Sequence, residues 1–161
     1  MKRLWAPWRM QYIGSEPRPG CLFCRVIEHP DDPDAELVVW RPKGAVVLLN
    51  KFPYNPGHAM VAPYKHASSF EELDDPQSLN LVRAQRRTLQ VLRNTLKPDG
   101  FNVGSNLGNA AGAGIPDHVH IHIVPRWNGD TNFMAVIDDV KIVNEALAQT
   151  ADKLKRAFAE T

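Results

Sequence analysis

Short apolar runs, separated by polar and turn-forming residues, predict a chain built largely of strands. Five runs carry β-branched or apolar residues over the length of a strand, at residues 36–40, 45–50, 57–62, 101–106 and 118–124. Pro42, Lys43 and Gly44 lie between the first two runs and have the turn chemistry of a hairpin. Pro63 ends the third run, and a loop rich in glycine and alanine, residues 107–114, joins the last two.

Two longer segments have the periodicity of amphipathic helices. The first follows Asp74 or Asp75, either of which can serve as its N-cap, has Pro76 in its first turn and ends at residues 98–100. Its apolar side chains recur at steps of seven, three and four residues and predict one buried stripe, at Val82, Leu89, Leu92 and Leu96. The second segment, residues 140–158, predicts a C-terminal amphipathic helix.

Two other segments are rich in proline. Residues 29–36, HPDDPDAE, combine acids and prolines that cannot continue regular structure, and they predict a loop. Residues 1–20 combine aromatic side chains with prolines and predict an extended arm that packs on the domain or on a partner subunit. Strands in a meander, with helices between and after them, predict an α+β fold. We expect an antiparallel five-stranded sheet with one long central helix and a C-terminal helix.

Length and composition predict one domain. A chain of 161 residues with 43% hydrophobic residues buries one core and is too short for two, so residues 1–161 are expected to form a single domain with its core in residues 21–161. The 19 basic and 18 acidic residues leave a formal charge of +1, which disfavours nucleic acid or an anionic membrane as a partner. No apolar run approaches the roughly 20 residues of a membrane span, and the first residues lack the apolar stretch of a signal peptide. A cytoplasmic location is therefore expected.

The most informative segment is 118–127, where three histidines alternate with apolar residues. Because side chains alternate between the faces of a strand, His118, His120 and His122 are expected to project from one face. A half-exposed strand with chance histidines and three ligands of one metal ion are the alternatives. Residues at i, i+2 and i+4 spread over roughly 13 Å on a flat strand, which disfavours one shared ion without another element.

At these residues the chain resembles the histidine-triad superfamily. His-x-His-x-His followed by two apolar residues and Pro-Arg matches the signature of that family. Residues 48–50 and 55–63 are similar to the family's nucleoside-binding segment, and the spacing of Asn50 to His58 agrees with it. The resemblance extends over most of the chain, to bacterial members of the diadenosine tetraphosphate phosphorylase kind, through residues 3–5, 111–114 and 127–133.

The resemblance implies that His120 is the nucleophile of a nucleotidyl transfer, with His118 as another member of the triad. Neutral imidazole is a good nucleophile near neutral pH, and a covalent nucleotidyl-histidine divides one difficult substitution into two easier ones. In the family, a backbone carbonyl of the same strand fixes the tautomer of this histidine. His122 is then expected beside a phosphate oxygen, where a donor stabilises developing charge. His58 is expected to face the triad from a neighbouring strand and to support its hydrogen bonds.

The resemblance also implies residues that bind the nucleotide. Asn50 is the candidate for the ribose hydroxyls, because an amide both donates and accepts hydrogen bonds; a turn residue is the alternative. Asn106 and the loop with Gly112, Ala113 and Gly114 are expected to hold phosphate, because small side chains let backbone N–H groups approach anionic oxygens. Many hydrolytic relatives carry Gln or Ser just before the triad, and this chain carries neither. The acceptor that discharges the intermediate therefore stays open between water and phosphate.

Cys21 and Cys24 are the only cysteines and have the spacing of two zinc ligands. A redox pair more naturally leads into a βαβ unit, which is not predicted here, and two buried thiols are the other alternative. In zinc-containing members of the family, a histidine after the proline-bounded strand and the first triad histidine complete the site, which implies His66 and His118. Four protein ligands leave no open coordination position, so the zinc is expected to be structural.

The resemblance therefore predicts an enzyme, a nucleotidyl hydrolase or transferase that cleaves dinucleoside polyphosphates, with no organic cofactor. A nucleotide-binding scaffold or signalling protein with little turnover is the alternative, which the intact triad with Asn50 and His58 disfavours. Family members pair their sheets and central helices across a two-fold axis. A homodimer or higher homo-oligomer is therefore predicted.

Overall fold

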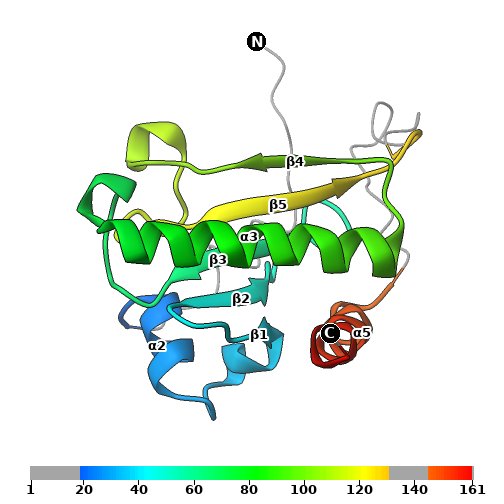
Figure 1. The fold of residues 1–161 in the computed structure, drawn as a ribbon, viewed down its shortest axis with the longest axis horizontal. Helices are drawn as coiled ribbons and strands as arrows, with labels where there is room; N and C mark the ends of the chain where they lie inside the picture. The colour runs from blue at the N-terminus through cyan, green and yellow to red at the C-terminus, as the bar shows by residue number, and fades with distance from the viewer. Residues whose placement is uncertain (1–18, 131–144, 161) are drawn as a thin grey trace.

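A five-stranded antiparallel sheet forms the centre of the protein (Figure 1). The computed structural model describes residues 19–130 and 145–160. The strands are β1 (Val38–Trp40), β2 (Ala45–Leu49), β3 (Ala59–Pro63), β4 (Gly100–Gly104) and β5 (Ile121–Arg126). They lie in the order β1-β2-β3-β5-β4, with every neighbouring pair antiparallel. The predicted α+β class and five-stranded sheet are confirmed.

The long central helix α3 (Asp75–Leu96) connects β3 to β4 and lies across the sheet (Figure 1). Its N-cap is Asp74, whose carboxylate accepts a hydrogen bond from the Gln77 N–H over 2.8 Å. The Gln77 side chain in turn accepts one from the Asp74 N–H over 3.0 Å. This reciprocal capping box satisfies two N–H groups near the helix start. The predicted helix and its cap are confirmed.

The buried stripe of α3 differs from the predicted one. Val82 is 57% exposed, whereas Leu81 and Leu92 are buried. Leu89, Leu92 and Leu96 pack against the core as predicted, so only the first residue of the predicted stripe is misplaced. Small Ala84 and the buried Thr88, whose hydroxyl donates to the Ala84 carbonyl over 2.8 Å, form part of the true stripe. The prediction was wrong at Val82 and missed Ala84 and Thr88, because it followed only large apolar side chains.

The C-terminal helix α5 (Leu147–Ala159) packs against β1 and α3. Its Phe158 ring stacks on the Trp40 ring of β1, with centroids 4.9 Å apart. The predicted C-terminal helix is therefore confirmed from residue 147 onward. Residues 131–144 lie outside the described residues, and so does the predicted N-terminal arm except for residues 19 and 20.

A short helix that the sequence pattern does not predict, α2 (Leu22–Glu28), follows Cys21 directly. Its buried side chains are Phe23 and Val26. Two apolar contacts over seven residues are too few to produce a helical periodicity, because that signal needs a window of about 11–18 residues. The helix is stabilised by packing against the sheet, which is a tertiary interaction.

Residues 29–36, predicted as a loop, contain the start of a 3₁₀ helix, η1 (Pro33–Leu37). Asp32 caps it by accepting a hydrogen bond from the Asp34 N–H over 2.8 Å. Proline is tolerated here because the first residues of a helix have no internal partner for their N–H groups. The prediction of an irregular loop was wrong in this part. Two further 3₁₀ turns are η2 (Phe70–Glu72) and η3 (Asn109–Ala111).

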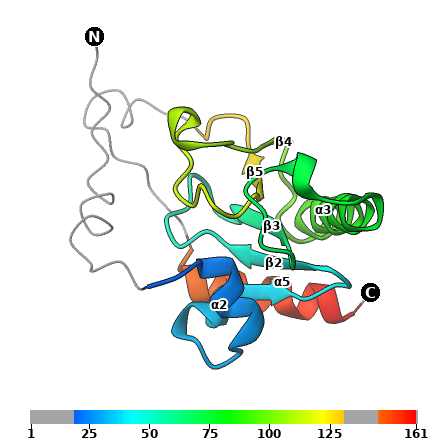
Figure 2. The same ribbon diagram turned by 90° about the vertical axis from the view of Figure 1, so that its left-hand side faces the viewer.

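Helices cover both faces of the sheet (Figure 2). Residues of β2 alternate between the faces: Val47 and Leu49 pack in a core with α3 and α5, and Val46 and Leu48 pack in a second core with α2. All of these side chains are buried, and each contributes about 1.5–3 kcal/mol relative to an exposed position. The face that α2 covers carries the histidines, as described below.

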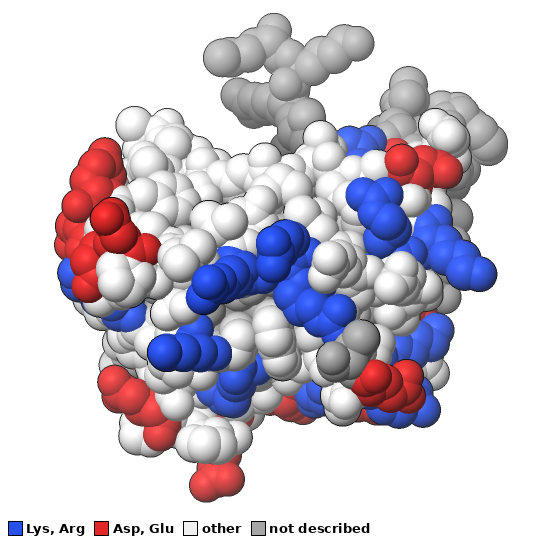
Figure 3. Space-filling model, in the orientation of Figure 1, with Lys and Arg blue, Asp and Glu red and all other residues white. Residues whose placement is uncertain are grey.

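Lys and Arg side chains gather over the outward side of α3 (Figure 3). Arg83, Arg86 and Arg93 are exposed on this helix, and Lys97 follows it. The formal charge of the whole chain is nevertheless only +1, so this is a local feature of one face. Within residues 19–130 and 145–160, none of the helices combines the length and hydrophobicity that a membrane span requires.

Candidate active site and metal centre

The first two histidines of the predicted triad lie just before a strand. β5 begins at Ile121, so His118 and His120 precede it, which corrects the predicted strand start at residue 118. The Val119 N–H donates over 2.7 Å to the carbonyl of Ala67, a residue beyond the end of β3. Residues 118–120 are therefore held by this contact and by their side chains, and regular pairing with β3 starts only at Ile121.

The three histidines share one side of the sheet, as predicted. His122 lies opposite Met60 of β3, which belongs to the core under α2. The ring centroid of Phe23 in α2 lies 5.0 Å from that of His118 and 4.9 Å from that of His120. The rings of His120 and His122 are 4.7 Å apart. The helix α2 therefore forms one wall of the histidine site.

His120 has the protonation state that a nucleophile requires. Its Nδ1 lies 2.8 Å from the carbonyl oxygen of His118. A carbonyl only accepts hydrogen bonds, so Nδ1 is assigned the hydrogen and Nε2 of the neutral ring keeps its lone pair. Burial lowers the pKa of His120 below its usual 6.5, which keeps the ring neutral near pH 7. The Ser105 hydroxyl donates to the His120 carbonyl over 2.7 Å and holds this residue against the end of β4.

His58 and His122 form a directed chain of hydrogen bonds. The Tyr54 N–H donates to His58 Nδ1 over 3.1 Å, so this nitrogen is an acceptor and Nε2 carries the hydrogen. His58 Nε2 lies 3.0 Å from His122 Nδ1 and donates to it. The remaining hydrogen of His122 is then on Nε2. The backbone at Tyr54 thereby makes His122 Nε2 a donor, next to the lone pair that the His118 carbonyl leaves on His120 Nε2.

Burial keeps the hydrogen-bonded rings of His58 and His122 uncharged. It lowers the pKa of His58 to about 3, with the neighbouring rings of His122 and His120 adding to the shift. It lowers the pKa of His122 to about 4, with His120 adding to the shift. Each imidazolium would lose its hydration and would repel another imidazolium nearby. The site is therefore neutral throughout the range near pH 7.

The turn before His58 depends on Gly57. The Gly57 backbone has φ of 77°, and a Cβ placed there would come within 2.4 Å of the Leu96 side chain of α3. The His58 N–H closes the turn on the Asn55 carbonyl over 3.1 Å. Glycine is needed for both the left-handed backbone and the close approach. The turn positions the His58 ring under the triad.

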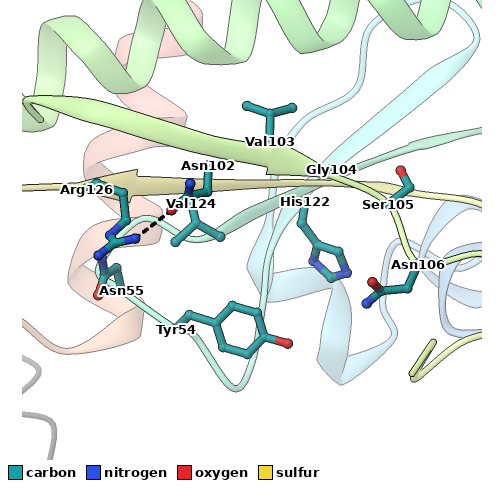
Figure 4. Close-up of a pocket in the computed structure, with 10 residues that line it drawn as sticks. All are labelled: Tyr54, Asn55, Asn102, Val103, Gly104, Ser105, Asn106, His122, Val124 and Arg126. Atoms are coloured by element: carbon teal, nitrogen blue, oxygen red, sulfur yellow. Dashed lines mark hydrogen bonds between the residues drawn. The ribbon is translucent and has the colours of Figure 1, made fainter. Parts of the chain in front are cut away.

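A pocket of about 530 Å³ adjoins the histidines (Figure 4). It lies between the turn before β3 and the neighbouring strands β4 and β5. Its lining residues are Tyr54, Asn55, Asn102, Val103, Gly104, Ser105, Asn106, His122, Val124 and Arg126. The predicted residues His122 and Asn106 therefore meet at one cavity. Its volume lies in the range of about 300–1,000 Å³ that is typical of small-molecule sites.

A polar clamp closes the far end of this pocket. Arg126 donates from Nε and Nη2 to the carboxylate of Asp130 over 2.6 and 2.9 Å. Its Nη1 donates to the Asn102 side chain over 2.6 Å. Buried Asn55 donates to the same carboxylate and to the Pro125 carbonyl, each over 2.8 Å. Hydrogen bonds from Arg126 hold the pKa of Asp130 well below its usual 3.8. The clamp ties the turn before β3 to the end of β5.

The other predicted nucleotide residues lie outside this pocket. Asn50 follows β2, and its side-chain oxygen accepts from the Phe52 N–H over 2.9 Å, as in an Asx turn. Its amide nitrogen lies 3.5 Å from His58 Nδ1. Gly112, Ala113 and Gly114 lie on the loop after η3 and are not among the pocket residues. The roles of these four residues stay predictions.

The four predicted metal ligands come together in space. The ligand atoms of Cys21, Cys24, His66 and His118 all lie within 4.8 Å of one another. His118 Nδ1 lies 3.2 Å from Cys21 Sγ and 3.7 Å from Cys24 Sγ, and His66 Nδ1 lies 3.2 Å from Cys24 Sγ. Tetrahedral Zn–S bonds of about 2.3 Å and Zn–N bonds of about 2.0–2.1 Å place ligand atoms at similar separations. The cluster therefore has the geometry to hold a metal ion.

The surroundings of these atoms also fit a metal. His118 Nε2 lies 2.9 Å from the Pro63 carbonyl oxygen and donates to it, so the Nδ1 lone pair faces the cysteines. Burial and the adjacent Cys21 raise the pKa of Cys24 to about 11. A metal cation would offset this, because coordination deprotonates a thiol. His118 thus has two roles. Its ring contributes Nδ1 to the metal cluster, and its backbone carbonyl accepts the hydrogen bond from His120 Nδ1.

The sequence pattern misses several residues of the site. Phe23 stands between the two cysteines and is visible as an aromatic residue, but only α2 directs it at the histidines. Tyr54 contacts His58 through its backbone N–H, and the residue type at a position does not predict where its backbone N–H points. Asp130 and Ser105 contribute through contacts with β5 and the triad that depend on the fold.

The model of the HIT domain family matches residues 34–129, which is more than half of the chain. The chain belongs to the HIT family. It is 38% identical to the AP-4-A phosphorylase of Mycobacterium tuberculosis over 168 aligned positions, which cover 99% of this chain and 85% of the relative. It is 30% identical to an adenosine 5′-monophosphoramidase of Schizosaccharomyces pombe, over 68% of this chain and 76% of that one. The predicted family is confirmed.

Solved HIT structures have the same fold. A zinc-bound histidine triad family protein from Mycobacterium smegmatis matches with a TM-score of 0.70 and 24% identity, over 88% of this chain and 94% of that one. A hypothetical histidine triad nucleotide-binding protein from Sulfolobus tokodaii matches with a TM-score of 0.70 and 24% identity, over 87% and 93%. At this identity the likeness supports the fold.

Proposed function

We propose that this chain cleaves dinucleoside polyphosphates, such as diadenosine tetraphosphate, through a nucleotidyl-His120 intermediate. At the coarser level, the predicted enzyme class is confirmed, because its HIT relatives include nucleotide-processing enzymes. The observation that carries the proposal is the pair of assigned tautomers. Nε2 of His120 holds a lone pair, and Nε2 of the adjacent His122 holds a hydrogen.

The first step uses these two nitrogens. His120 Nε2 attacks the α-phosphorus of the substrate, and a P–N bond forms as the bond from phosphorus to the bridging oxygen breaks. The leaving nucleotide takes the electron pair on that oxygen, where His122 Nε2–H donates a hydrogen bond to the developing charge. His58 supports the donor through its hydrogen bond to His122 Nδ1. Asn50 is proposed for the ribose hydroxyls, and Asn106 with Gly112, Ala113 and Gly114 for the phosphate.

The second step discharges the intermediate. A phosphate oxygen or a water oxygen attacks the same phosphorus, and the P–N bond breaks to restore His120. Phosphate as acceptor yields a nucleoside diphosphate, and water yields a monophosphate. The 38% identity to a protein named AP-4-A phosphorylase, over nearly the whole chain, supports phosphate.

A nucleotide-binding scaffold is the second candidate function. Binding alone requires a pocket but does not require a lone pair and a donor on adjacent rings. The neutral, hydrogen-bonded histidines here have both, and their burial disfavours protonation that would inactivate the nucleophile. The geometry therefore favours catalysis over binding alone.

We also propose that Cys21, Cys24, His66 and His118 hold a zinc ion. Two sulfur and two nitrogen ligands at tetrahedral separations suit zinc, which prefers such a set. Four protein ligands leave no position for substrate, so its contribution is to hold the N-terminal segment and His118 in place. Through His118, whose carbonyl orients His120, the ion supports the nucleophile indirectly.

Product analysis on diadenosine tetraphosphate tests the function. Purified protein is incubated with the substrate, with and without inorganic phosphate, and the nucleotides are separated by chromatography. We expect ADP and ATP in equal amounts when phosphate is present. AMP and ATP in both reactions would show hydrolysis and would contradict the phosphorolytic form. Absence of turnover in both reactions would contradict the enzymatic proposal.

A further inference from the structure

The pocket beside His122 continues along β5, away from the triad. His122, Val124 and Arg126 alternate on one face of the strand and span roughly 13 Å. Two of the residues at the His122 end, Tyr54 and Asn106, point into the same space as the His122 ring (Figure 4). The donor nitrogen of His122 would contact the leaving oxygen, so whatever is attached to that oxygen extends into this space.

The charges that line the pocket indicate that it binds an uncharged part of the leaving group. Among the described residues that line it, Arg126 is the only charged one, and its guanidinium is already paired with the Asp130 carboxylate. The remaining polar lining side chains, apart from Tyr54 and His122, are amides and one hydroxyl, of Asn55, Asn102, Asn106 and Ser105. Tight binding of a bare polyphosphate requires cations, and the described lining offers one guanidinium that is already paired. Amides and hydroxyls instead suit the hydroxyl and amine groups of a nucleoside.

Tyr54 supplies an aromatic surface at the mouth of this pocket. The residue is 51% exposed, so its ring is accessible to a ligand. Its ring lies 4.6 Å from the His58 ring and 6.4 Å from the His122 ring, between centroids. The hydrogen bond from its own N–H to His58 fixes the backbone that carries the ring. A base can stack on such a surface without displacing a buried side chain.

We propose that this pocket binds the nucleoside of the leaving nucleotide, and that Tyr54 stacks on its base. Tyr54 is then a specificity-determining residue that favours substrates with a second nucleoside. The inference rests on the proposed function, because a leaving nucleoside exists only when the substrate is a dinucleoside polyphosphate. It differs from the binding of the transferred nucleoside, which is proposed for Asn50, a residue outside this pocket.

Two substrates that transfer the same group to His120 test the contact between Tyr54 and the leaving nucleoside. Diadenosine tetraphosphate and adenosine 5′-tetraphosphate both donate AMP to His120 and both carry four phosphates, but only the first has a leaving nucleoside. We expect Tyr54→Leu to lower kcat/KM for diadenosine tetraphosphate about tenfold, the loss typical of one stacked base. The value for adenosine tetraphosphate should change less than about twofold. Tyr54→Phe keeps the ring and should remain near wild type with both substrates.

Matched variants and the second substrate separate the possible outcomes. Tyr64→Leu removes another exposed tyrosine, 40% exposed and outside the pocket, and should change neither value. An equal loss with both substrates would mean that Tyr54 acts through His58, and it would overturn the proposal. An unchanged kcat/KM with both substrates would overturn it while leaving the proposed function intact. A wild-type protein that cleaves neither substrate would refute the proposed function and this inference with it.

Discussion

His120 and His58 differ in the partner of their Nδ1 atoms. Nδ1 of His120 donates to a backbone carbonyl, whereas Nδ1 of His58 accepts from a backbone N–H. Each backbone group fixes a tautomer, so two chemically identical rings acquire opposite roles at their Nε2 atoms. Because His58 Nε2 therefore carries a hydrogen and donates it to His122 Nδ1, the hydrogen of His122 is on Nε2, which becomes a donor. The chemistry of single residues is thus set by the groups next to them.

We expect His120→Ala to reduce turnover of diadenosine tetraphosphate below about 3% of wild type, because it removes the atom that forms the covalent bond. AMP binding, measured by titration calorimetry, should remain detectable, since the pocket residues are unchanged. His29→Ala is the matched control, because His29 is exposed and lies outside the site. Turnover above this level in His120→Ala would refute the role of His120 as nucleophile.

The lowered pKa values of His58 and His122 predict a dependence of stability on pH. In the unfolded chain these rings bind protons near pH 6.5, but in the folded chain only near pH 3 and pH 4. Between these limits the unfolded state holds more protons, so stability is full above pH 6.5 and falls as pH decreases. Each histidine should contribute a slope of up to about 1.4 kcal/mol per pH unit.

Urea unfolding at pH 7, 6 and 5 measures this slope directly. The acid limb of kcat/KM should also lie below pH 6.5, because the lowered pKa keeps His120 unprotonated there. A free energy of unfolding that is constant from pH 7 to pH 5 would show that the histidines are not buried as described. An acid limb at or above pH 6.5 would contradict the neutral nucleophile.

Among the elements, the short helix α2 is the one that the proposed metal site would anchor to the sheet. The helix has seven residues, and a helix of this length is not stable alone. It packs two buried side chains against the sheet, and its start carries Cys21 and Cys24. The opposite ligands, His66 and His118, lie just after β3 and just before β5. An ion bound at the proposed site would therefore join three segments that are distant in sequence.

We expect Cys24→Ser to lose most bound zinc and to lower the melting temperature, because an ion that binds only the native state adds stability by mass action. Elemental analysis and thermal unfolding measure the two effects. Some activity should remain at low temperature, since His120 is intact. Chelator should lower the melting temperature of the wild type but not that of Cys24→Ser. Well under one zinc per wild-type chain, with equal melting temperatures, would mean that the cysteines are buried thiols.

At the scale of the whole molecule, two neighbouring elements present apolar side chains to solvent. Leu79 and Val82 on α3 are 48% and 57% exposed, and Val103 on β4 is 43% exposed. β4 is also an edge strand, which has unpaired N–H and C=O groups along one side. Exposed apolar residues beside an open edge are typical of a surface that another copy covers.

We therefore predict a homodimer in solution that uses α3 and β4. Light scattering at micromolar concentration should give twice the mass of the chain. Val82→Glu introduces a charge that a partner subunit would have to bury, so this variant should shift the protein toward the monomer. The same change at exposed Tyr64, which belongs to neither α3 nor β4, serves as the control. A wild-type monomer at micromolar concentration would contradict the prediction.

Local patterns in the sequence predict most of the strands and the capped central helix. They also single out the histidines and cysteines as candidate site residues. Strand periodicity, turn residues and caps are properties of neighbours along the chain. His118, His120 and His122 share one side for this reason, although the regular strand begins only at Ile121. The ligand set follows from family resemblance, and its members lie within 4.8 Å of one another in the fold.

Only the tertiary structure decides the features that join distant residues. Cys21 and His118 are 97 positions apart, and no periodicity relates them. The helix α2 and the true stripe of α3 depend on which surface the sheet presents, because packing overrides weak local preferences. The tautomers of His120 and His122 depend on backbone groups, whose directions residue type does not specify. The pocket with Tyr54 exists because a turn and two strands meet there.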